Sequence, residues 1–110
     1  MRDNIKGGAL TETTLLVLLA VYKPNHGYGI MQFIEKTTGG RVVLGAGTLY
    51  GAINAVVKKK WITPFESETD GRKKEYVITD AGKQKVSEEL KRMNELLELA
   101  SIIVKEDDRK

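Results

Sequence analysis

The chain has 110 residues, 41% of them hydrophobic and 30% charged, and its formal net charge is +3. This length indicates one domain, and the composition is ordinary for a soluble globular protein. Because the chain has no cysteine, disulfides, thiol catalysis and cysteine-ligated zinc are excluded. The single histidine, His26, excludes a histidine-rich metal site, so we expect neither a metal nor a cofactor.

No segment is typical of a membrane-spanning or secreted protein. The most apolar run, from Leu15 to Tyr22, falls far short of the roughly 20 residues that a spanning helix needs. The N-terminal sequence M-R-D-N-I-K-G-G lacks the apolar core of a signal peptide. We therefore expect a cytoplasmic protein without membrane contacts.

The first predicted helix lies in T-E-T-T-L-L-V-L-L-A-V-Y, where Thr11 is a good N-cap and Glu12 suits the positive end of the helix dipole. Residues 15–22 are apolar on all sides of the helix, which favours burial on more than one side. Such a helix is either purely a core element or one that also meets a second subunit.

Two further helices follow. The sequence K-P-N-H-G ends the first helix, and Asn25 or His26 can cap a second one over about 27–36, which T-T-G-G terminates. A third helix is predicted over about 46–59. Its apolar face, at helical spacing, consists of Leu49, Ile53, Val56 and Val57.

A hairpin is predicted next. Trp61, Thr63 and Phe65 alternate along one strand, and Tyr76 and Ile78 along another. The T-D-G sequence at 69–71 is typical of a hairpin turn, and Pro64 favours an edge strand or a bulge. The returning strand begins with three basic residues, Arg72, Lys73 and Lys74.

The last predicted element is a long helix from about Asp80, with Thr79 as its N-cap. Its apolar residues are spaced alternately four and three apart, as in a coiled-coil seam: Val86, Leu90, Met93, Leu97, Ala100 and Val104. We expect this seam to pack on a partner. The predicted organisation is a DNA-binding unit over 8–79, a C-terminal dimerisation helix over 80–105 that forms one compact unit with the first helix, and a frayed tail over 106–110.

The glycines of G-A-G-T-L-Y-G at 45–51 resemble a nucleotide-binding loop only superficially. The third glycine falls one residue late for a dinucleotide fingerprint, and no G-K-[ST] follows for a P-loop. The acidic residues form no matched pair, and the sequence has no nucleophile motif. We expect no enzyme and no catalytic residues, with His26 serving as a helix cap.

The order helix, helix, helix, basic hairpin is instead that of a winged helix-turn-helix, so the predicted fold class is mainly α with a small β-hairpin and a long C-terminal helix. The third helix would enter the major groove of DNA. Its small leading end, including Gly47 and Thr48, would let free amides approach phosphate, and Asn54 can pair with adenine. Basic contacts to phosphate are assigned to Lys58, Lys59, Arg72, Lys73 and Lys74. Taken singly, each lysine run is equally consistent with a solvated surface.

Three motifs together resemble the PadR family of bacterial transcriptional regulators: H-G-Y-G-I at 26–30, T-L-Y at 48–50 and D-G-R-K-K-E-Y-V-I-T-D-A-G at 70–82. The resemblance covers about residues 8–100 and is closest to the short branch with one C-terminal helix. By position it implies that Tyr28 and Tyr50 lie near the DNA backbone, that Thr48 begins the recognition helix, and that Arg72 is the wing arginine.

The resemblance also implies a homodimeric repressor with a small hydrophobic effector bound near the dimer interface. The predicted interface and ligand pore comprise Leu15, Leu18, Val86, Leu90, Met93, Leu97, Ala100 and Val104. The chain departs from the family pattern at five positions. Gly51 and Ala55 stand where the family usually has a basic residue at one or the other position, and Val57 stands where it has a glutamate. Lys60 replaces a glycine and would need a positive φ, and Met93 stands where some members have a pore aromatic.

The sequence thus predicts a repressor that binds a pseudo-palindromic double-stranded operator as a homodimer. Two alternatives stay open at this point. One is a dimeric interaction module that has lost DNA binding, which Gly51 and Ala55 would explain. The other is a ligand sensor dominated by its dimer pore.

Overall fold

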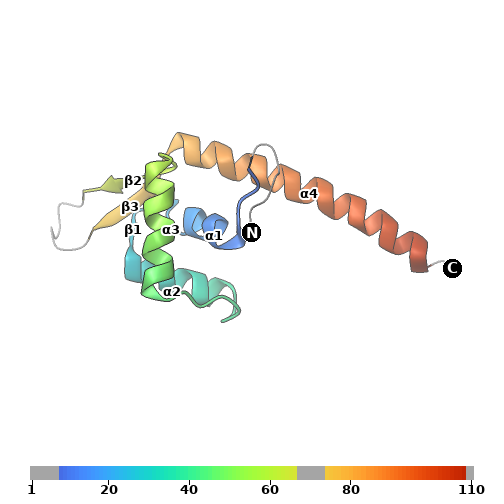
Figure 1. Cartoon of the computed structure of the whole chain (residues 1–110), viewed down its shortest axis with the longest axis horizontal. Coiled ribbons are helices and arrows are strands. Elements are labelled where there is room, and N and C mark those ends of the chain that lie inside the picture. Colours follow the sequence, from blue (N-terminus) through green and yellow to red (C-terminus); the bar gives the residue numbers. More distant parts are fainter. Residues whose placement is uncertain (1–7, 67–73, 109–110) are drawn as a thin grey trace.

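The computed structural model describes residues 8–66 and 74–108 and shows a helical head from which one long helix projects (Figure 1). The molecule measures 62 × 29 × 26 Å along its principal axes. This architecture confirms the predicted mainly helical fold with a small sheet. The elements in chain order are α1 (Glu12–Ala20), β1 (Asn25–His26), α2 (Gly27–Thr37), α3 (Ala46–Lys58), β2 (Ile62–Phe65), β3 (Glu75–Ile78) and α4 (Asp80–Asp108).

The hydrophobic core forms around α1, which contacts α2, α3 and α4. Burying one large aliphatic side chain stabilises a fold by about 1.5–3 kcal/mol, so the buried side chains of these helices hold the head together. The side chains that are at most 1% exposed are Val17, Leu18, Val21, Ile30, Ile34, Leu49, Ile53, Val56 and Ile62.

The sheet is antiparallel with strand order β1-β3-β2. Pairing of β2 with β3 confirms the predicted hairpin, and Pro64 lies on an edge strand as expected. The third strand, β1, was not predicted, because two residues between a proline and a helix show no alternation. It pairs Asn25 with Tyr76 and His26 with Glu75. The predicted turn at 69–71 lies outside the described residues.

Local capping fixes the helix ends as the sequence predicts. Thr11 Oγ1 accepts from Thr14 N, His26 Nδ1 from Gly29 N, and Thr79 Oγ1 from Gly82 N. After α2, Gly39 and Gly40 adopt φ of 61° and 81°, which glycine tolerates without a steric cost.

One boundary differs from the prediction. Helix α4 continues to Asp108, so the tail predicted to fray from residue 106 is helical through 108. The physical reason is that the sequence here offers no glycine or proline to stop the helix. Within residues 8–66 and 74–108, no helix has the length and hydropathy to span a bilayer.

Candidate nucleic-acid interface

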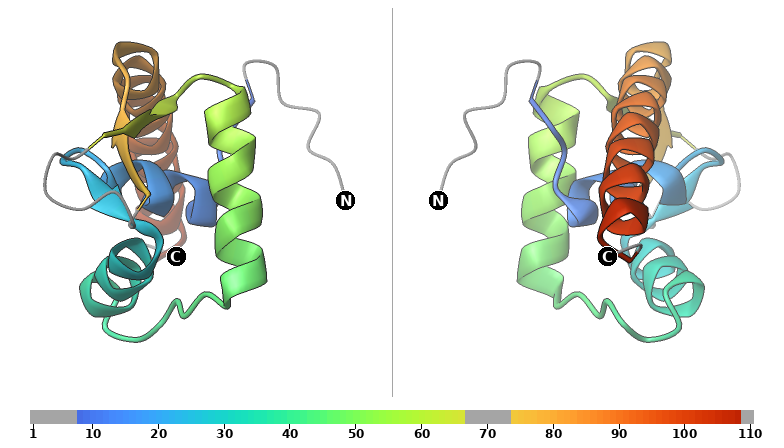
Figure 2. Two further views of the ribbon diagram at one scale, coloured as in Figure 1. Left: turned by 90° about the vertical axis from the view of Figure 1, so that its left-hand side faces the viewer. Right: turned by 90° about the vertical axis from the view of Figure 1, so that its right-hand side faces the viewer.

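One face of α3 is open to solvent. Leu49, Ile53 and Val56 anchor the helix to the core, and the opposite side is free (Figure 2). This exposed face carries no acidic residue, and its side chains are mostly small. It consists of Gly47, Thr48, Tyr50, Gly51, Asn54, Ala55 and Lys58.

The amino end of α3 is uncapped by any side chain. Its N-cap residue is Gly45, which has no side chain to accept a hydrogen bond, whereas α1, α2 and α4 are capped by Thr11, His26 and Thr79. Amides in the first turn of a helix lack partners within the helix and carry its positive dipole end. The start of α3 can therefore accept an anion such as a phosphate.

The H-G-Y-G motif packs against Tyr50, which lies in the first turns of α3. Gly27 is buried against Tyr50, and Asn25 fills the space beside Gly29, where a Cβ would lie 2.1 Å from Asn25 Oδ1. Asn25 also donates to Ala20 O (3.2 Å) and accepts from His26 N (2.9 Å). Tyr28 and Tyr50 remain exposed, at 62% and 47% of their surface. His26 is thus the N-cap residue of α2, as expected.

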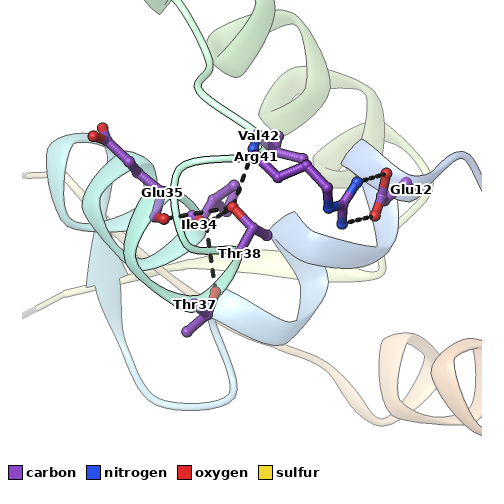
Figure 3. Close-up of polar contacts among 7 residues, drawn as sticks. All are labelled: Glu12, Ile34, Glu35, Thr37, Thr38, Arg41 and Val42. Carbon is purple, nitrogen blue, oxygen red and sulfur yellow. Dashed lines mark hydrogen bonds and ion pairs between the residues drawn. The ribbon is translucent and has the colours of Figure 1, made fainter.

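The loop that leads from α2 into α3 is held by Thr38 and one ion pair (Figure 3). Thr38 Oγ1 donates to Ile34 O (2.8 Å) and accepts from Val42 N (3.1 Å). Arg41 Nη1 donates to Glu12 Oε1 (3.1 Å), and this hydrogen bond lowers the pKa of Glu12. Both partners of the ion pair are exposed, so it fixes the loop position more than it stabilises the fold.

The carboxyl end of α3 turns sharply into β2 at Lys60, which has a φ of 66°. This confirms that a lysine here adopts the conformation for which glycine is better suited. Next to it, the Lys59 and Lys85 ammonium groups lie 5.1 and 5.7 Å from the centroid of the Trp61 ring. Thr79 N donates to Trp61 O (2.9 Å), which ties this turn to the start of α4.

The predicted basic wing is only partly described. Lys74 is exposed, and its Nζ lies 5.8 Å from the centroid of the Tyr76 ring. Arg72 and Lys73 lie outside the described residues, so their role stays a prediction.

The predicted dimer residues divide into three groups by exposure. Leu18 and Val86 are 0% and 3% exposed and belong to the core of the single chain, so the structure removes them from the surface that a partner could contact. The spacing could not show this, because core and interface residues share one apolar helix face. Leu90, Met93, Leu97, Ala100 and Val104 are exposed along α4. Leu15 is half-buried beside Met93 and lines a 320 Å³ cavity between α1 and α4.

An ion pair at this cavity, in which the carboxylate is buried and the arginine is partly exposed, was missed by the sequence reasoning. Glu89 is only 4% exposed and accepts from Arg92 Nε (3.1 Å). The hydrogen bond from Arg92 lowers the pKa of Glu89, and the backbone amide of Leu10 adds to this effect. The sequence shows that Glu89 and Arg92 are three residues apart, which allows them to pair on one helix face. It does not show that Glu89 is buried, which makes this pair stronger than a surface pair.

Comparison with known proteins identifies the family of the chain. Residues 15–88 match the model of the transcriptional regulator PadR-like family. The chain belongs to this family. PadR-like proteins are transcriptional regulators rather than enzymes.

Individual relatives extend the comparison. The chain is 36% identical over 86 residues to an uncharacterized 37.1 kDa protein in transposon Tn4556 of Streptomyces fradiae. The match covers 77% of this chain but 24% of that protein. The chain therefore spans about a quarter of the length of that relative. It is also 29% identical over 106 residues to an uncharacterized protein X of Lysinibacillus sphaericus, with 94% of this chain and 95% of that one covered.

Solved structures show the same fold. A transcriptional regulator from Clostridium thermocellum matches with a TM-score of 0.63 and 25% identity over 86% of this chain and 90% of that one. A PadR family regulator from Clostridium difficile matches with a TM-score of 0.69 and 19% identity. This match covers 86% of this chain and 99% of that one. The second likeness supports the PadR fold alone.

Proposed function

We propose that this PadR-like protein is a repressor that binds a pseudo-palindromic DNA operator as a homodimer in the cytoplasm. The observation that carries the proposal is the exposed face of α3, which is free of acidic residues and begins with an uncapped helix end. A helix with these properties can lie in the major groove, where its first amides meet the phosphate backbone.

The exposed residues suggest a division of roles at the DNA. Asn54 can form two hydrogen bonds with adenine, which gives sequence preference. Tyr28, Thr48 and Tyr50 are exposed and would contact the DNA backbone. Phosphate contacts that are independent of sequence are assigned to Lys58, Lys59, Arg72, Lys73 and Lys74.

The exposed apolar side chains of α4 support the homodimer. This 29-residue helix carries eight large apolar residues that are 43–64% exposed. Monomeric proteins rarely expose an apolar surface this continuous, and a second copy of the same helix would cover it. A dimer would also present two α3 helices to half-sites about one DNA turn, or a multiple of it, apart.

The effector would be a small hydrophobic molecule at the α1–α4 boundary. The cavity there is lined by apolar side chains, including Leu15, Leu16 and Met93, and by the Glu89–Arg92 pair. Since this cavity borders the exposed face of α4, a bound molecule there would alter how two subunits pack.

Selection from random DNA by the purified protein tests the proposal. We expect an enriched sequence with two-fold symmetry, and fluorescence anisotropy with that duplex should show affinity falling steeply with salt. Arg72→Ala should weaken binding to all sequences, whereas Asn54→Ala should relax preference at one base pair, costing about 1–3 kcal/mol. No enriched sequence and no salt dependence would contradict DNA binding.

One alternative has a specific observation behind it. Gly51 and Ala55 leave the middle of the exposed α3 face without side chains that can bond to DNA. A dimeric interaction or ligand-sensing module would therefore show a stable dimer in light scattering with no DNA affinity at low salt. In a ligand sensor, saturable thermal shifts with hydrophobic compounds should also disappear in Met93→Glu.

A further inference from the structure

Lys60 is held in a backbone conformation that its side chain disfavours. Among the described residues, it is the only residue other than glycine with a positive φ. Its amide donates to Val57 O (2.9 Å), and the amide of Trp61 donates to Val56 O (3.0 Å). These two bonds form a Schellman motif, in which the left-handed position is usually glycine because a Cβ there crowds the backbone.

The surrounding structure prevents this turn from relaxing. Thr79 Oγ1 donates to Lys60 O (2.7 Å), and Thr79 N donates to Trp61 O. Gly82 packs so closely that a Cβ added to it would lie 2.1 Å from Trp61 O. The strain at Lys60 is therefore a fixed feature of the joint between α3 and α4.

The fold gains no described contact from the Lys60 side chain in return. Lys60 is exposed, and no hydrogen bond, ion pair or ring contact joins its ammonium group to the described residues. The neighbouring Lys59, by contrast, places its ammonium group near the Trp61 ring. A strained residue that persists without an internal contact points to a use outside the chain.

The position of Lys60 suggests what that use is. Helix α3 has 13 residues, which is about 20 Å at 1.5 Å per residue. The major groove is about 12 Å wide. If the amino end of α3 meets the phosphates of one strand and the helix axis crosses the groove, the helix is long enough for its carboxyl end to reach the phosphates of the opposite strand.

We propose that Lys60 is an additional DNA contact, which binds a backbone phosphate on the strand opposite the one met by the start of α3. This inference rests on the proposed function. Because a phosphate contact is independent of sequence, it acts in non-specific binding and can be tested before the operator is known.

The experiment compares Lys60→Gly and Lys60→Asn with the wild type by anisotropy of a labelled, mixed-sequence duplex over a series of salt concentrations. Both substitutions remove the charge, and both residues tolerate a positive φ. We expect each to reduce the slope of log Kd against log salt by about 0.9 for each subunit bound. Lys60→Arg should keep the slope, and Lys105→Asn, at the far end of α4, should leave it unchanged.

Thermal unfolding supplies the second readout. Lys60→Gly should raise the Tm because it relieves the strain, so its weaker binding cannot come from unfolding. A wild-type slope that persists in both Lys60→Gly and Lys60→Asn, or a Tm that falls in Lys60→Gly, overturns the role of Lys60 and leaves the proposed function standing. A wild type without any salt-dependent binding overturns both.

Discussion

Gly27 lies directly against Tyr50: a Cβ at Gly27 would be 2.3 Å from Tyr50 Oη and 2.8 Å from Tyr50 Cζ. This contact joins the first residue of α2 to the first turns of α3. It gives a physical reason for two of the motifs by which the sequence resembles its family, since the glycine of H-G-Y-G makes room for the tyrosine of T-L-Y. Gly82 of D-A-G has a similar role, because it lets α4 approach Trp61 O.

Gly27→Ala should destabilise the protein by about 1–3 kcal/mol, because the added methyl group overpacks the contact with Tyr50. Urea unfolding of a double-mutant cycle checks this expectation. In a Tyr50→Ala background the same glycine substitution should cost much less. Gly47→Ala is the matched control, since Gly47 lies in the first turn of α3 and nothing lies within 4 Å of a Cβ at that position. Equal costs of Gly27→Ala in both backgrounds would contradict the contact.

Gly51→Arg should increase both stability and DNA affinity. A Cβ at Gly51 meets open space, and replacing glycine within a helix stabilises it by roughly 0.5–1 kcal/mol. If this face of α3 lies on DNA, the added charge should steepen the salt dependence by about 0.9 for each subunit. Gly51→Gln separates the two effects, because it should raise the stability without changing the salt dependence of DNA binding. Identical DNA binding by the Arg and Gln variants would show that the face points away from DNA.

Thr79→Ala should reduce stability by about 1–2 kcal/mol, measured by thermal or urea unfolding. The hydroxyl of Thr79 accepts from Gly82 N (3.0 Å) to cap α4 and donates to Lys60 O to close the turn after α3. Thr79→Ser keeps the hydroxyl and should retain most of the stability. A Ser variant as unstable as the Ala variant would mean that the methyl group, not the hydroxyl, matters.

Glu89 should make stability depend on pH in the acidic range. Its pKa is lowered in the folded chain, chiefly by the hydrogen bond from Arg92, so the folded state favours the charged carboxylate. The stabilisation is therefore present above the unfolded pKa of about 4.3 and is lost as pH falls through the folded pKa.

Glu89→Gln should accordingly lose roughly 1 kcal/mol at neutral pH, a modest amount because Arg92 is partly solvated. The stability of this variant should also depend less on pH than that of the wild type. Urea unfolding at several pH values between neutral and acidic measures this difference. Glu95→Gln, at an exposed position of the same helix, is the control. A wild type whose stability is unchanged below pH 4 would rule out this role for Glu89.

The sequence by itself determined the features that depend on neighbours along the chain. The caps at Thr11, His26 and Thr79 follow from interactions within a few residues. The edge position of the strand that contains Pro64 follows from the missing amide hydrogen of proline.

Only the tertiary structure decided which residues from distant segments meet. Strand β1 exists because Asn25 and His26 lie beside β3, and Glu89 matters because α1 and the preceding residues cover it. The apolar seam of the last helix shows the same limit, since its spacing marks one continuous face. The fold buries Val86 at one end of that face and exposes Leu97 further along, because α1 is shorter than α4 and covers only its first turns.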